Sequence, residues 1–135
     1  MACQITPNCM KKIIKTTNAP APIGPYSQAV QAGNFLFVSG QVAINPENGE
    51  LNIGNIEEET HQVMRNLKAV LLEAGLTFDN VVKSTIFLSD MGTFAQVNEV
   101  YGQYFTADFP ARETVQVSVL PKNVNVEISV IAIAG

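Results

Sequence analysis

The sequence has few of the residues from which metal sites and nucleophilic active sites are usually built. It has a single histidine, His61, and its two cysteines, Cys3 and Cys9, both lie near the N-terminus. A lone histidine without a nearby cysteine does not predict a zinc site. No serine lies in a nucleophile elbow, so a Ser-His-Asp triad has no support, and we interpret His61 as an exposed helix residue. The cysteine positions argue against a disulfide framework and agree with a reducing compartment.

Positive charge is also scarce. The chain has 8 Lys and Arg against 12 Asp and Glu, which gives a net charge of −4. Basic residues gather only at Lys11, Lys12 and Lys15, so the electrostatic surface that nucleic acids require is missing. We therefore expect no nucleic-acid partner.

Long apolar runs and nucleotide-binding loops are absent from the sequence as well. The sequence contains no run of about 18 apolar residues, so no membrane helix is predicted. The N-terminus lacks the apolar core of a secretory signal. No Walker loop or GxGxxG motif occurs, and we expect no cofactor. The sequence favours a cytoplasmic protein. A mitochondrial location is the alternative because residues 1–17 are basic, although they lack the arginines of a transit peptide.

The length and composition of the chain are typical of one folded domain. The chain has 135 residues, of which 47% are hydrophobic and 15% charged, and this length supports a real core. We interpret residues 11–135 as a single domain and residues 1–10 as a flexible N-terminal extension.

Two segments have the periodicity of helices. Asn55 is a good N-cap, Glu58 stands three residues later as in a capping box, and Gly75 provides a stop. Between them, apolar residues recur with helical spacing from position 60 to 74. A second helix is predicted over 94–105, with an aromatic and aliphatic stripe that we assign to the core.

Alternating and β-branched segments predict the strands, over residues 11–16, 26–31, 34–39, 81–88, 114–120 and 124–134. The short Pro-Lys-Asn link between the last two predicts a hairpin. Helices between consecutive strands imply parallel crossovers. We therefore expect an α+β fold: a mixed six-stranded sheet with both helices on one face. The other face of the last strand carries Ile131 and Ile133, which favours coverage by another subunit.

A small polar set lies at the ends of these apolar segments, namely Tyr26, Ser39, Gly40, Arg112 and Glu127. Arginine offers a planar fork that matches a carboxylate, and glycine lets a backbone approach a ligand closely. Serine can donate a hydroxyl, and a glutamate can hold or activate water. This set indicates recognition of a small carboxylate.

Structural interpretations of the same residues are also open. Arg112 and Glu127 could form an ion pair, an alternative of equal weight on the sequence alone. Tyr26 could be a packed aromatic residue, and the Ser-Gly pair a simple strand end. Asn98, on the second predicted helix, could be solvated surface.

Four motifs together resemble a known family. APIGPYSQAV, FLFVSGQVAINPENGEL, FPARETVQV and LPKNVNVEISVIA are similar to the Rid family of reactive intermediate deaminases, the YjgF-like proteins. The similarity runs from about residue 12 to the C-terminus. It implies a chorismate-mutase-like α+β fold and a homotrimer with sites in the clefts between subunits.

The resemblance also implies an activity, the hydrolysis of reactive 2-imino acids such as 2-iminobutanoate and 2-iminopropanoate to 2-keto acids and ammonia. This would detoxify imines released by pyridoxal-phosphate enzymes. Arg112, in the PAR motif, would hold the substrate carboxylate, and Glu127, in VEI, would position the attacking water. Tyr26, Ser39 and Gly40 match pocket residues, and Asn98 matches an asparagine at the border of the site.

One position departs from the family pattern. Many deaminases have cysteine two residues after the arginine, where this chain has Thr114; the backbone N–H used there is retained. Glu113 directly follows Arg112 and should turn away from the site. Other functions stay open: an endoribonuclease or translation inhibitor, a non-catalytic trimer that binds keto acids, or a structural oligomer with a vestigial cleft.

Overall fold

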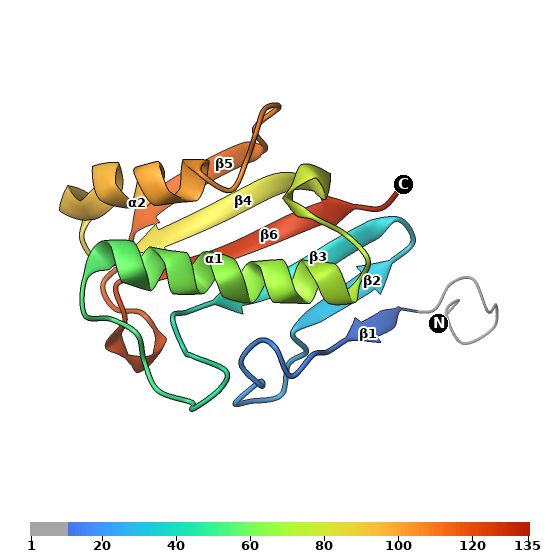
Figure 1. Ribbon diagram of the computed structural model, residues 1–135, viewed down its shortest axis with the longest axis horizontal. Helices are drawn as coiled ribbons and strands as arrows, with labels where there is room; N and C mark the ends of the chain where they lie inside the picture. The colour runs from blue at the N-terminus through green and yellow to red at the C-terminus, as the bar shows by residue number, and fades with distance from the viewer. Residues whose placement is uncertain (1–10) are drawn as a thin grey trace.

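The computed structural model describes residues 11–135, which fold as one sheet covered on one face by two helices (Figure 1). The predicted extension at residues 1–10, with both cysteines, lies outside the described residues. The strands are β1 (Lys12–Ile14), β2 (Ala29–Ala32), β3 (Phe35–Gln41), β4 (Val81–Leu88), β5 (Ala111–Gln116) and β6 (Val126–Ile133). The helices are α1 (Ile56–Glu73) and α2 (Phe94–Gly102). Within residues 11–135, the helices are too short or too polar to cross a membrane.

The sheet is mixed, in the order β1-β2-β3-β6-β4-β5. β4 and β5 run parallel and are connected through α2, whereas β6 runs antiparallel to both β3 and β4. The predicted six-stranded α+β architecture is therefore confirmed.

The predicted hairpin between the last two strands is wrong, because β4 lies between β5 and β6. The crossover through α2 places β5 beside β4 at the sheet edge. The chain then passes the end of β4 through a short turn, Pro121–Asn123, and enters β6 on the other side. Leu120 and Val124 are buried on either side of this turn and anchor it. The alternating pattern identified the strands but could not determine their neighbours.

Helix α1 begins and ends as its sequence predicts. The side chain of Asn55 accepts a hydrogen bond from the Glu58 backbone N–H at 2.8 Å, which satisfies one free N–H of the first turn. Its buried residues, among them Val63, Leu67 and Leu71, recur on one face and pack on the sheet. This face holds α1 across β3 and β6.

Alternation along β6 separates two faces of the sheet. Its residues Val126, Ile128, Val130 and Ala132 are all buried under the helices. On the opposite face, Ile131 pairs with Phe37 and Ile133 with Phe35, and these two phenylalanines are 46% and 45% exposed in the single chain. The second face is thus more apolar than a water-facing sheet surface usually is.

A buried carboxylate fastens α1 to the start of β6. Glu59 is fully buried, and its oxygens accept hydrogen bonds from the backbone N–H groups of Asn125 at 2.7 Å and Val126 at 3.0 Å. They also accept one from the Asn125 side-chain amide at 2.8 Å. Because three donors converge on it, burial of this carboxylate is compensated.

Substitution of Glu59 by Ala should destabilise the fold strongly, since it leaves these buried donors without an acceptor. We expect the free energy of unfolding to fall by about 3 kcal/mol, measured by urea denaturation. Glu57→Ala, in the same helical turn but exposed, should cost less than about 1 kcal/mol. Equal losses in the two variants would contradict this role for Glu59.

Candidate functional site

The predicted site residues form two separate groups, one on each face of the sheet. The first surrounds Arg112, near the start of the edge strand β5. Arg112 is aligned with Ser84 of β4, and Ser84 is buried under the helices, so the arginine side chain lies on the helical face. Its guanidinium donates a hydrogen bond to Asn98 Oδ1 at 2.6 Å. The exposed Asn98 is therefore also a direct partner of the arginine.

Two aromatic rings of α2 lie against the same guanidinium. Its central carbon is 5.2 Å from the centre of the Tyr101 ring and 5.5 Å from that of Phe94. A cation over a ring face is attracted by the ring quadrupole. Asn98, Tyr101 and Arg112 line a cleft with a volume of about 430 Å³, together with Gly102, Phe109 and Pro110. The arginine fork thus borders an open cleft that is lined by both polar and apolar residues.

Tyr101 belongs to the stripe that the sequence assigned to the core, but it also carries a polar contact. Its hydroxyl donates a hydrogen bond to Ser84 Oγ at 2.8 Å, and both residues are buried. Burial raises the pKa of Tyr101, partly offset by the Ser84 hydrogen bond and the positive charge of Arg112. Sequence reasoning missed this pair because its members are 17 residues apart on different elements.

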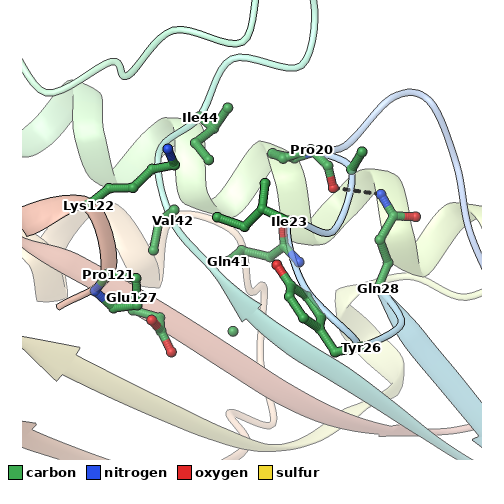
Figure 2. Close-up of a pocket in the computed structure, with 12 residues that line it drawn as sticks. Pro20, Ile23, Tyr26, Gln28, Gln41, Val42, Ile44, Pro121, Lys122 and Glu127 are labelled. Carbon is green, nitrogen blue, oxygen red and sulfur yellow. Dashed lines mark hydrogen bonds between the residues drawn. The ribbon is translucent and has the colours of Figure 1, made fainter.

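The second group surrounds Glu127, on the outer face of β6 (Figure 2). Figure 2 shows Tyr26 and Glu127 at the same pocket, with Ile23, Val42 and Lys122 among the other residues that line it. The pocket has a volume of about 80 Å³. Its walls are largely apolar, and Glu127 contributes a carboxylate to them.

Gly40 leaves room at this pocket for the Glu127 side chain. A Cβ atom at position 40 would lie only 2.8 Å from Glu127 Cδ and would overlap its carboxylate. The glycine lies at an irregularity of β3 between Val38 and Gln41, where pairing with β6 shifts register. The sequence predicted close approach of the Gly40 backbone to a ligand; within one chain, the side chain that the Gly40 backbone approaches is Glu127.

Glu127 lies in a partly dehydrated environment. Burial raises the pKa of its carboxyl group above the ordinary value of 4.5. Among the described residues its carboxylate takes part in no ion pair; the two ion pairs found join Arg65 to Glu58 and Lys83 to Glu113. Glu127 is therefore a carboxylate that can take up a proton more readily than an exposed one.

An ion pair between Arg112 and Glu127 does not exist within one chain, which removes one alternative left open by the sequence. Glu127 is aligned with Phe87, while Arg112 is aligned with Ser84, and these two β4 residues point to opposite faces. Glu113, next to Arg112, reaches the outer face and pairs with Lys83 at 3.1 Å, as alternation predicts.

Two further predicted site residues, Ser39 and Thr114, lie on different strands. The Ser39 hydroxyl donates to the backbone carbonyl of Ser27 at 2.6 Å, so its proton is engaged in holding β3 near Tyr26 rather than free. Thr114 lies on the helical face of β5, two residues from Arg112, and its buried Oγ1 has no partner among residues 11–135.

Two other features differ from or extend the sequence analysis. His61 is not exposed: it is half-buried, and its Nδ1 lies 2.8 Å from the Tyr104 hydroxyl. Gln28, which no motif argument singled out, is buried and donates to the carbonyls of Thr16, Ala19 and Pro20. It fixes the proline-rich loop that forms one wall of the Glu127 pocket (Figure 2). Within residues 11–135, no cluster of three or more His, Cys, Asp or Glu is arranged to hold a metal ion.

Comparison with known proteins places this geometry in a family. The family model described as Endoribonuclease L-PSP matches residues 16–134. A RutC family protein of Pyrococcus horikoshii is 54% identical over 123 residues, which cover 91% of this chain and 98% of that protein. The 2-iminobutanoate/2-iminopropanoate deaminase of Mus musculus is 48% identical over 126 residues, 93% of each chain.

Solved structures agree with the fold. The crystal structure of Escherichia coli TdcF with bound serine superposes with a TM-score of 0.88, at 41% identity, and covers 92% of this chain and 99% of that one. The likeness extends over almost the whole described domain, and the relatives named 2-iminobutanoate/2-iminopropanoate deaminase share it. The chain therefore belongs to the Rid, or YjgF-like, family that its motifs resemble.

Proposed function

We propose that this protein hydrolyses 2-imino acids to 2-keto acids and ammonia, at a site that two subunits complete together. The observation that carries the proposal is the arrangement of Arg112. Its guanidinium borders an open cleft and uses one N–H on Asn98. As far as residues 11–135 are concerned, the other N–H groups are available to grip a carboxylate with two parallel hydrogen bonds. The TdcF relative binds serine, which, like a 2-imino acid, is a small molecule with a carboxylate.

The second half of the proposed site is the Glu127 pocket of a neighbouring subunit. Because Arg112 and Glu127 lie on opposite faces of one sheet, a single chain cannot bring them to one small substrate. The apolar outer face, with Phe35 and Phe37 exposed, is suited to burial against another copy. We propose the homotrimer expected from the family, with Arg112 of one subunit facing Glu127 of the partner subunit.

The chemistry needs only orientation and proton transfer. Arg112 binds the carboxylate and thereby fixes the adjacent C=N carbon. Glu127 takes a proton from a water as the water oxygen bonds to this carbon, and the π electrons move to nitrogen. Glu127 returns this proton to nitrogen, which gives a carbinolamine. The hydroxyl proton then moves to the amine nitrogen, the oxygen lone pair forms the C=O bond, and the C–N bond breaks to release ammonia. One water is consumed and one ammonia released, with no change in oxidation state.

Two other functions are alternative outcomes of the same experiments. The family model carries an endoribonuclease description, but the chain has an acidic balance and one histidine, which bonds Tyr104. A non-catalytic keto-acid-binding protein would use the same arginine fork. It would bind carboxylates without turnover.

Replacing Arg112 by Lys should abolish most imine hydrolysis, because an ammonium lacks the planar fork. A threonine dehydratase supplies 2-iminobutanoate, semicarbazide traps it, and the assay measures how far the protein lowers the trapped fraction. We expect kcat/KM to fall by about a hundredfold or more. Arg65→Lys, the same change at the other arginine, is the control and should keep full activity.

Full activity in Arg112→Lys would refute the proposed carboxylate clamp. If the wild-type protein leaves trapping unchanged but binds 2-oxobutanoate, the non-catalytic alternative is correct. RNA cleavage that requires Arg112 would instead support the ribonuclease.

Mixing two inactive variants should restore activity if the site is shared between subunits. Co-expressed Arg112→Ala and Glu127→Gln chains would form mixed trimers in which some interfaces combine an intact Arg112 with an intact Glu127. With random assembly of equal amounts, about one quarter of the interfaces would be intact, and activity should return to that fraction. No recovery in trimers shown by mass spectrometry to be mixed would exclude a shared site.

The pH dependence should report the ionisation of Glu127. Burial raises its pKa above 4.5, and the proposed base must be deprotonated, so kcat/KM should rise with pH through this raised pKa. Glu127→Gln should lower turnover sharply and remove this acid limb. Glu113→Gln, which alters a carboxylate already paired with Lys83, should retain it. An unchanged profile and rate in Glu127→Gln would rule out the proposed role.

A further inference from the structure

We propose that Tyr101, held by Ser84, is a positioning residue that fixes the Arg112 guanidinium for carboxylate binding; the kinetic part of this inference rests on the proposed function. Arg112 extends from an edge strand that is paired on one side only, by β4. Backbone pairing therefore gives limited control over a long side chain with many rotamers. Its guanidinium must be held by its neighbours.

Those neighbours come from one face of α2. Phe94, Asn98 and Tyr101 follow the spacing i, i+4, i+7, which places them in one row along the helix. Phe94 and Tyr101 each present a ring to the guanidinium, and Asn98 accepts its hydrogen bond at 2.6 Å. The position of the guanidinium thus depends on the position of α2.

Tyr101 is the member of this row whose side chain bonds to β4, the strand that pairs with the strand of Arg112. Its hydroxyl donates to Ser84 Oγ at 2.8 Å, and Ser84 is the residue of β4 aligned with Arg112. The hydrogen bond therefore joins α2 to the sheet at the same level as the arginine. Tyr101 is 4% exposed and Ser84 fully buried, so neither hydroxyl can exchange this partner for bulk water.

The kinetic test compares Tyr101→Phe, Ser84→Ala and the double variant with the wild-type oligomer. Tyr101→Phe keeps the aromatic ring, and Ser84→Ala removes only the serine hydroxyl. Each change therefore removes the anchoring hydrogen bond with little loss of volume. We expect KM for 2-iminobutanoate to rise about five- to tenfold, with kcat changed less than about twofold. The double variant should show the same KM as the single variants.

Thermal stability separates positioning from a merely structural role. Each single variant leaves one buried hydroxyl unpaired, whereas the double variant leaves none, so its melting temperature should recover toward that of the wild type. Under the proposal, stability recovers while KM stays high. A KM that recovers together with stability would overturn it.

Tyr104→Phe is the matched control. Tyr104 lies three residues after Tyr101, and its hydroxyl bonds His61 rather than a group near Arg112. Removing this hydroxyl should leave KM unchanged. Equal increases in KM for the two tyrosine variants would show a general effect of loosening this region and would contradict the inference.

A second readout does not need enzymatic activity. The chain has two arginines, Arg65 and Arg112, so the arginine Nε–H region of an NMR spectrum should contain two side-chain signals. The Arg112 signal should shift in Tyr101→Phe and Ser84→Ala as the ring moves, with Arg65 as the internal reference. An unchanged Arg112 signal would refute positioning. A shifted signal in a protein without deaminase activity would leave positioning intact and refute the proposed function.

Discussion

The two-residue alternation of the β-strands is the constraint on which the rest of this structure depends. It places one set of β6 side chains under the helices and the other set, including Glu127, on the outer face. The same rule directs Arg112 toward α2. The two groups most suited to chemistry therefore occupy opposite faces of a single sheet. Each is surrounded by its own supporting residues, and neither face of a single chain presents both the guanidinium and the Glu127 carboxylate.

Features with a local physical cause were predictable from the sequence. The first turn of α1 follows from its N-cap Asn55, and the buried and open faces of β6 follow from its alternation. Strand neighbours were not predictable, because alternation specifies faces but not partners. This is why the last two strands were expected to form a hairpin although β4 lies between them.

The candidate site shows the same limit. The sequence predicted a carboxylate clamp at Arg112 and a water-positioning carboxylate at Glu127, but it could not show whether the two residues form an ion pair or occupy separate sites. The Tyr101–Ser84 hydrogen bond was hidden because a tyrosine at helical spacing among apolar residues has the pattern of a core residue. The role of its hydroxyl can be identified only once the position of Ser84 on β4 is known.

The separation of the two half-sites has a consequence for how such a protein would be controlled. If the proposed pairing of subunits is correct, a free chain carries both reactive groups yet has no complete site. Dilution below the dissociation constant of the oligomer would then extinguish turnover without any inhibitor, and specific activity would depend on protein concentration. Catalysis would start only on assembly, so a newly made chain would be inactive until it associated with other copies of the same chain.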